Sequence, residues 1–320
     1  MRTASEPTAG TASRNAGADR RTARVKSAAL AALLPLLAGC AGSSGPGAAA
    51  PPVSYTAFAN PTLVAINGYT GDAMEPFISK DGQYLFFNNR NDPSINTDLY
   101  YAARVDDQTF TFLGPVPNVD SPQLDAVASL DTLGNFYFVS TRSYSTTLST
   151  LYSGEFSGTT VSNIALVPGI SMQKAGWVNF DAEISADGQT LWFDDGQYTS
   201  SGVLQAASIV IANREGGVFA RQGNSAALLA TVNSSGLNYA PSISVDGLEL
   251  FFTRLASSTS GASPAIYRAV RTDSSSAFGE PELVAAATGF VEAPSLSADG
   301  HLLYFHKMVN GTFVIYHIER

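Results

Sequence analysis

Reactive and charged side chains are scarce in this sequence of 320 residues. It holds one cysteine and three histidines, and only 14% of its residues are charged. A single cysteine excludes an intramolecular disulfide, so the core alone must hold the fold together. Soluble domains carry about 25% charged residues, and the shortage here excludes long charged helices and coiled coils. The histidines (His301, His306 and His317) lack the spacing of zinc ligands, so we expect no metal site and no cofactor.

The few charges that are present are mostly acidic. Without residues 1–39 the chain keeps 12 basic and 25 acidic side chains, a net charge of −13. An acidic surface repels phosphate backbones, so nucleic acid is excluded as a partner. The sequence also lacks the Gly-x-Ser-x-Gly motif of esterases and any glycine-rich phosphate loop.

Residues 1–39 have the features of an export signal. Arg20, Arg21, Arg24 and Lys26 precede a 13-residue apolar run, which is too short to span a bilayer as a helix. This run ends in Leu-Ala-Gly followed by Cys40, which resembles the bacterial lipobox. The resemblance implies that Cys40 becomes the lipidated first residue of the mature protein, which anchors it to a membrane.

The residues after Cys40 predict a tether. Residues 40–54 are rich in glycine, alanine and proline and carry no charge, which is typical of a flexible linker. Ala41 stands where an aspartate would indicate retention in the inner membrane. The lipobox resemblance therefore implies an outer-membrane lipoprotein that faces the periplasm or the cell surface, with its folded domain in residues 55–320.

Five internal repeats fill that domain. Each copy has a short apolar stretch, a turn with glycine and an alternating apolar run, and the glycines recur every 52 to 59 residues. The second copy departs from the others because Leu133 stands where they have aspartate. The copies are Phe77–Phe87, Ser129–Phe138, Glu183–Phe193, Ser242–Phe252 and Ser295–Phe305.

The repeats predict a β-propeller. Asp-Gly between apolar runs is a strong hairpin signal, and we expect Asp81, Asp187, Asp246 and Asp299 to form the turns. Two further β-rich runs follow each hairpin, which makes four strands per repeat, as in a propeller blade. The last copy ends after its third strand. Residues 58–65 match residues 278–285, the fourth run of the preceding copy, at six of eight positions when Ala59 and Gly279 are counted as equivalent small residues.

We therefore expect an all-β fold, a five-bladed propeller of four-stranded antiparallel blades, with the N-terminal strand closing the ring. Tyr55–Ile66 should pair with Phe313–Ile318 in the last blade, which leaves no sheet edge unpaired. Fourth strands are expected at Phe110–Val119, Val161–Val167, Phe219–Ala230 and Phe278–Ala285. A closed ring of this kind is expected to be a monomer.

The repeated Ser-x-Asp-Gly-x-x-Leu-x-Phe pattern resembles the WD40-like propeller repeat of TolB-type proteins over residues 55–320. That resemblance is specific for the fold and says little about function. It implies a propeller whose ligands bind at one mouth of the central channel. No helix with sustained periodicity interrupts the pattern.

In this strand order, one mouth is built from the loop before each inner strand and the loop after each second strand. The first set of loops holds Asp72, Glu75, Asp125, Asp181, Glu183, Asn238, Tyr239 and Glu292, and the second holds Arg90, Asp92, Arg142, Asp194, Asp195, Arg254, His306 and Lys307. The candidate ligand-binding residues are Glu75, Arg90, Asp125, Arg142, Trp177, Asp181, Arg254 and Glu292.

Three roles remain open for these charges. Ion pairs between blades and turn caps are the commonest use of such residues. Alternatively, the mouth binds a protein, a peptide or an envelope glycan. The third alternative is a glycan hydrolase or lyase that uses two facing carboxylates. Acids that are each paired with an arginine would favour the first two roles, whereas converging carboxylates in an apolar setting would favour an enzyme. The sequence assigns no residue a catalytic role.

Overall fold

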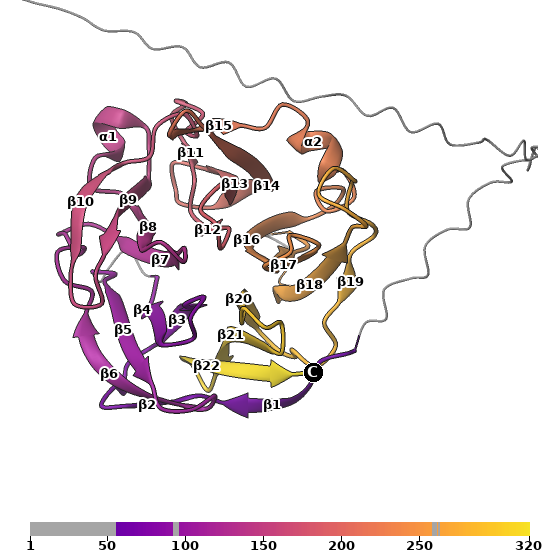
Figure 1. Ribbon diagram of the computed structural model, residues 1–320. Helices are drawn as coiled ribbons and strands as arrows, with labels where there is room; N and C mark the ends of the chain where they lie inside the picture. Colours follow the sequence, from indigo (N-terminus) through magenta and orange to yellow (C-terminus); the bar gives the residue numbers. More distant parts are fainter. Residues whose placement is uncertain (1–55, 92–95, 258–260, 262) are drawn as a thin grey trace, which may run out of the picture. The chain divides into compact units, whose positions relative to one another are not determined.

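Five small sheets arranged in a ring make up the folded part of the protein (Figure 1). The computed structural model describes residues 56–91, 96–257, 261 and 263–320. The predicted signal peptide, Cys40 and the tether lie outside these residues. Within the described residues, no helix is long and apolar enough to cross a membrane.

Each sheet is one blade, with its first strand facing the centre of the ring. Blade 1 holds β3 (Met74–Ile78), β4 (Tyr84–Asn88), β5 (Leu99–Arg104) and β6 (Thr109–Pro115). Blade 2 holds β7 (Asp125–Leu130), β8 (Asn135–Ser140), β9 (Leu151–Phe156) and β10 (Val161–Leu166), with the short helix α1 (Tyr144–Thr147) between β8 and β9.

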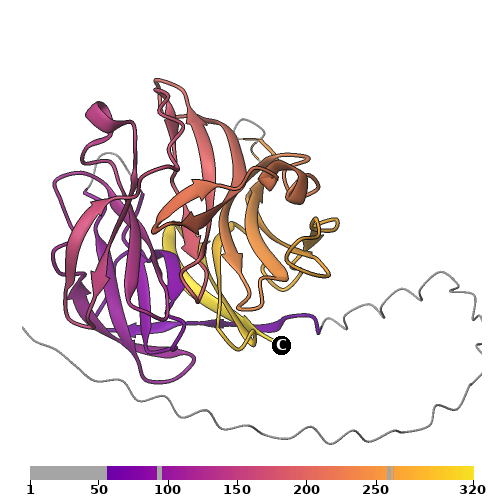
Figure 2. The same ribbon diagram turned by 45° about the horizontal axis from the view of Figure 1, so that its top comes forward.

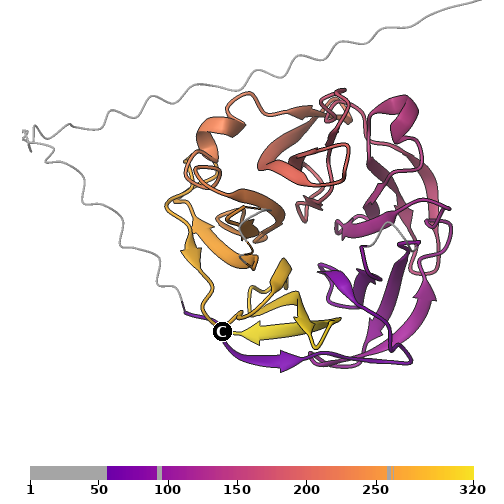
Figure 3. The same ribbon diagram turned by 180° about the vertical axis from the view of Figure 1, so that it is seen from behind.

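The next two blades depart most from the repeat. Blade 3 holds β11 (Trp177–Val178), β12 (Ala182–Ile184), β13 (Thr190–Tyr198), β14 (Leu204–Glu215) and β15 (Val218–Arg221), followed by α2 (Ser225–Leu228). Blade 4 holds β16 (Leu237–Ile243), β17 (Glu249–Leu255), β18 (Ala265–Val270) and β19 (Glu282–Leu283). The expected five-bladed, all-β propeller is confirmed, and seen from behind the ring shows the same five sheets (Figure 3).

The N-terminal strand closes the ring, as predicted. Blade 5 consists of β20 (Val291–Leu296), β21 (Leu302–Val309), β22 (Thr312–Glu319) and β1 (Ala59–Leu63). Strand β1 pairs antiparallel with β22, with Thr62 opposite His317. This strand runs past the last blade towards the first (Figure 2).

The closing segment does more than the sequence predicted. Val64 N–H still bonds to Ile315 O at 2.9 Å, but Ala65 N–H bonds to Gln108 O of blade 1 at 2.7 Å. From there β2 (Ala65–Asn67) pairs parallel with β6. The segment changes sheets because the Val64 side chain is buried in the apolar layer between blades 5 and 1. One piece of chain thus completes the last blade and extends the first.

Several fourth strands are shorter than expected, and β6 ends at Pro115 instead of Val119. Phe219–Ala230 contains only the end of β15 before α2, and Phe278–Ala285 contains only the two residues of β19. In blade 3, side chains take over the role of a paired strand. Asn233 bonds to both Ile209 N–H and Ile209 O at 3.0 and 2.9 Å, and Ser225 Oγ accepts Ile211 N–H at 2.9 Å.

The hairpin turns use the predicted aspartates. In blade 3, Ser185 Oγ donates to Asp187 Oδ1 at 2.6 Å, and Asp187 Oδ1 also accepts Gln189 N–H at 3.0 Å. Gly188 adopts φ of +72°, which glycine tolerates without strain. In the second copy Asp131 replaces the missing aspartate, because it accepts the N–H groups of Leu133 and Asn135 at 2.8 and 2.9 Å.

The apolar core is divided into layers between neighbouring blades. Successive side chains of a strand point to opposite faces, so the adjacent Phe86 and Phe87 of β4 enter different layers. Phe86 packs with Phe136 of blade 2, while Phe87 lies in the layer that also holds Tyr304 of blade 5. The Phe-Phe and Leu-x-Phe runs of the repeat therefore hold each blade to both of its neighbours.

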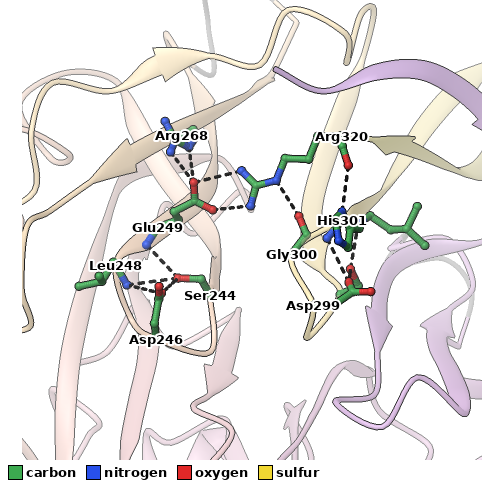
Figure 4. Close-up of polar contacts among 11 residues, drawn as sticks. Ser244, Asp246, Leu248, Glu249, Arg268, Asp299, Gly300, His301 and Arg320 are labelled. Atoms are coloured by element: carbon green, nitrogen blue, oxygen red, sulfur yellow. Dashed lines mark hydrogen bonds and ion pairs between the residues drawn. The ribbon is translucent and has the colours of Figure 1, made fainter. Parts of the chain in front are cut away.

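Arginines at the outer turns add polar contacts between strands and blades. Arg214, Arg271 and Arg320 each donate Nε–H to the carbonyl of a turn glycine, at 2.7 to 2.9 Å. Arg320 also reaches from blade 5 to Glu249 of blade 4, at 2.6 Å between Nη2 and Oε2, where Arg268 binds the same carboxylate (Figure 4). Burial alone would raise the pKa of Glu249, but the hydrogen bonds from Arg320 and Arg268 lower it.

Candidate functional site

A cavity of about 520 Å³ lies at the mouth of the channel, where the inner strands begin. All five blades contribute side chains to its lining. Figure 1 looks along the channel, with β3, β7, β12, β16 and β20 around the centre. Four of the eight candidate residues line this cavity: Glu75, Arg90, Asp181 and Glu292.

Two arginines among the other candidates are bound within their own blades. Arg142 pairs with the buried Asp125 at 2.5 Å and also donates to Val119 O. Arg254 donates to Asn238 Oδ1 and Val232 O, each at 2.8 Å. In both cases the arginine fixes the linker that leads into the inner strand, and neither side chain lines the cavity.

Trp177 lies apart from the cavity as well. It is half-buried in β11, with the Lys174 ammonium 5.1 Å from the centre of its ring. The structure therefore brings together the acidic candidates of blades 1, 3 and 5. It does not bring Asp125, Arg142, Trp177 or Arg254 into the same cavity.

Arg90 is the basic candidate that reaches the cavity, and its charge is already matched. Its Nε and Nη2 atoms bond to the two carboxylate oxygens of Asp72 at 2.9 and 3.0 Å. Its guanidinium also lies 5.2 Å from the centre of the Phe313 ring. Asp72 therefore compensates the charge of Arg90 with its own carboxylate.

The inner strands are kinked at the level of the cavity. Glu75, Val127, Ala240 and Ala293 occupy one position in four blades, and each has a φ of +50° to +54°. A β-bulge or register shift occurs at each of these points. Left-handed backbone is costly for residues other than glycine, so each kink needs support from its surroundings.

That support comes mainly from the second strand of the preceding blade. Val127 N–H donates to Asn88 Oδ1 at 3.2 Å, and Ala293 N–H donates to Thr253 Oγ1 at 2.9 Å. Glu75 N–H likewise donates to His306 Nδ1 at 3.1 Å. Asn88 and Thr253 were not among the sequence candidates. The signal was a polar residue directly after the Phe pair of the repeat, where a buried strand would otherwise continue.

Blade 3 replaces this arrangement with two aspartates. Asp194 Oδ1 accepts the N–H groups of Phe180 and Asp181 at 3.1 and 3.3 Å. Asp181 Oδ2 in turn accepts Ala240 N–H of blade 4 at 3.1 Å. Asp194 is fully buried, and its Oδ2 atom has no hydrogen-bond partner among the described residues.

Burial and crowding make these acids hard to ionise. Burial, with a contribution from the charge of Glu292, raises the pKa of Glu75 to about 7, although His306 and Asn91 oppose the rise. Burial raises the pKa of Asp194 to about 8. Burial and the neighbouring Asp194 raise the pKa of Asp181 well above its usual range. Part of the cluster is therefore protonated at neutral pH.

Glu292 differs because two side chains donate to it. Tyr239 Oη donates to its Oε1, and His306 Nε2 lies 3.2 Å from its Oε2. Since His306 Nδ1 accepts Glu75 N–H, the ring carries its hydrogen on Nε2 and donates it to Glu292. One histidine thus holds both the backbone of Glu75 and the carboxylate of Glu292.

The far end of the inner strands is crossed by a buried ion pair. Lys80 Nζ of blade 1 lies 2.6 Å from Glu183 Oε1 of blade 3, and each side chain is 4% exposed. Serines stand at the position of Glu183 in blades 2, 4 and 5, and Ser129, Ser242 and Ser295 each accept one N–H from the next blade at 2.9 to 3.0 Å. The pair joins two non-adjacent blades across the channel, on the side away from the cavity.

No protein-family model and no curated protein matches this chain. Several solved structures, however, match it. The GH62 α-L-arabinofuranosidase catalytic domain of Coprinopsis cinerea has a TM-score of 0.50 at 10% identity, over 82% of this chain and 96% of that one. The α-L-arabinofuranosidase of Podospora anserina, solved with cellotriose, has a TM-score of 0.50 at 11% identity, over 82% and 95%.

A TolB-type neighbour is also found. TolB from Acinetobacter baumannii has a TM-score of 0.45 at 12% identity over 78% of this chain, which spans 55% of the length of that protein. At these identities the likeness concerns the fold alone. The chain thus shares its fold with the two arabinofuranosidases.

Proposed function

We propose that this protein is a ligand-binding propeller that holds a glycan or a peptide in the mouth cavity. One observation carries the proposal: carboxylates from blades 1, 3 and 5 converge on a single cavity that aromatic side chains also line. Pockets that combine apolar walls with a few converging polar groups are typical ligand sites. The arginine-paired acids elsewhere, such as Asp125, are explained by their contacts within a blade.

Arrays of glycans and peptides, probed with the purified protein, test this proposal. We expect at least one ligand class to bind, and Glu75→Gln and Asp181→Asn to weaken its binding at least about tenfold, because each removes a charge-assisted contact. Glu155→Gln is the matched control, since Glu155 is exposed on β9 of blade 2. Equal loss in the control, or unchanged binding in both cavity variants, would contradict the proposal.

A second candidate function is glycan hydrolysis, and a specific observation favours it. Glu75 has its pKa raised to about 7, whereas the adjacent Glu292 accepts hydrogen bonds from Tyr239 and His306. One carboxyl that keeps its proton beside one that is held as an acceptor is the arrangement that glycosidases use. Release of reducing ends from the glycans that bind, and its loss in Glu75→Gln and Glu292→Gln, would establish this activity. Binding without turnover would exclude it for those glycans.

We also propose that the propeller works at a membrane, anchored through Cys40. The lipobox that ends at Cys40 supports this. Cys40→Ala should move the protein from the membrane fraction to the soluble fraction in a bacterial host, and should abolish labelling by a clickable fatty acid. A variant that stays in the membrane fraction with unchanged detergent partitioning would contradict it.

A further inference from the structure

We infer that the mouth cavity binds a primary ammonium group of its ligand, with Asp181 and Glu75 as the carboxylates that contact it. The inference rests on the proposed ligand-binding function and adds the chemistry of the group that enters. An ammonium carried by a lysine side chain and one carried by an amino sugar are the two sources that this chemistry allows.

The charge balance of the cavity is the first argument. Its lining includes the carboxylates of Glu75, Asp181 and Glu292, and its basic lining residue, Arg90, is engaged by Asp72. His306 faces Glu75 and Glu292, whereas Asp181 lies beside further acids, so a ligand that brings a positive charge would compensate Asp181. A carboxylate or phosphate ligand would meet only repulsion at the same place.

Asp194 provides an independent second observation. It is fully buried, and its Oδ2 atom has no partner among the described residues. When it is ionised, its charge is the largest electrostatic influence on Asp181 and on Tyr198, which both line the cavity. Ionising a carboxyl that is buried beside another acid costs free energy, and a cation bound at Asp181 would recover part of that cost.

The walls of the cavity also suit an alkylammonium. Phe180 stands with its ring centre 5.7 Å from that of Tyr198 and 5.6 Å from that of Tyr239. Phe290 and Phe313 form a second aromatic pair, at 5.9 Å. Aromatic faces attract cations and cover the methylene groups that carry them. Combined with carboxylates, they favour an ammonium on a short apolar stem over a neutral hydroxyl.

Binding should release protons. The groups that face Glu75 are Asn91 after β4, His306 on β21, Glu292 on β20, Tyr239 on β16, and Asp181 and Tyr198 in blade 3. Because the pKa of Glu75 is raised to about 7, its carboxyl is mostly protonated at pH 6 and mostly ionised at pH 8. A bound cation favours the ionised form of Glu75. The affinity of the protein for the cation should therefore be higher at pH 8 than at pH 6, and the proton that Glu75 loses on binding passes to the buffer.

The test compares ligands that differ only in the charged group. With the purified protein, n-butylammonium should bind at least about tenfold more tightly than n-butanol, and more tightly at pH 8 than at pH 6. A lysine peptide against its acetyl-lysine form, and a glucosamine oligomer against its N-acetyl form, then identify the source. Asp181→Asn should remove the preference, and the exposed control Glu155→Gln should keep it.

Two results would overturn the inference. One is equal binding of butylammonium and butanol by the wild-type protein, a comparison that needs no variant to fold. The other is an unchanged preference in both Asp181→Asn and Glu75→Gln. If array ligands still bind in a way that depends on the cavity residues while amines show no preference, the ammonium inference fails and the proposed binding function stands. If the array ligands bind independently of those residues, both fail.

Discussion

Deleting residues 53–66 is expected to abolish the cooperative unfolding transition of the propeller. The deletion removes β1 and most of the crossing into blade 1, and it leaves β22 and β6 with unpaired edges. It also removes Phe58 and Val64, which are both 6% exposed in the structure. Loss of two buried side chains and a strand costs on the order of 5–10 kcal/mol, which is comparable to the whole stability of a domain.

Thermal unfolding followed by circular dichroism and light scattering measures this effect. Aggregation or a broad transition is the expected outcome for the deletion. The single variant Phe58→Ala should lose about 3–5 kcal/mol, because Phe58 packs edge-on against Phe251 with 5.8 Å between ring centres. Leu63→Ser is the matched control in the same strand, since Leu63 is 52% exposed. A deleted protein that melts like the intact one would exclude closure by this segment.

Breaking the Lys80–Glu183 pair should cause the second large effect. Lys80→Met leaves the carboxylate of Glu183 buried without its partner, and removal of one member of a buried pair costs about 3–5 kcal/mol. Chemical denaturation of each single variant should show a loss of this size. The double variant Lys80→Met/Glu183→Leu should recover much of it, because no buried charge remains.

An exposed ion pair provides the control for that cycle. The Arg104 and Asp107 side chains pair at the surface of blade 1 and are 40% and 50% exposed. Asp107→Asn should cost less than about 1 kcal/mol. If the Lys80 variant cost no more than the Asp107 variant, the buried pair would not hold blades 1 and 3 together across the channel.

The fold was predictable because each repeat encodes its own blade. The Ser-x-Asp-Gly turn and the alternating run after it act over fewer than a dozen residues, so the hairpins follow from local sequence. Ring closure was predictable from the match between residues 58–65 and 278–285. The pairing of β2 with β6 was not, because it depends on where the Val64 side chain packs between two blades. The short outer strand of blade 3 depends on Asn233, whose contacts with Ile209 no repeat encodes.

The site was predictable in part, for a related reason. Loop position in the repeat identified Glu75, Asp181 and Glu292, since equivalent positions lie at equivalent radii around a ring. Loop position did not distinguish the acids that face the cavity from Asp125. Arg142, which also occupies a recurring loop position, binds Asp125 within blade 2. Tyr198 was missed because β13 extends beyond the expected strand end and carries it to the cavity.

The claim that the mouth is the ligand site is tested most directly by hydrogen–deuterium exchange with the tightest-binding array ligand. Protection is expected where the inner strands begin, in residues 74–77, 180–182, 239–241 and 291–293, because these segments line the cavity or lie directly beneath it. Protection confined to the turns at the opposite end, in residues 80–83, 186–189 and 245–248, would place the ligand on the other face and contradict the account.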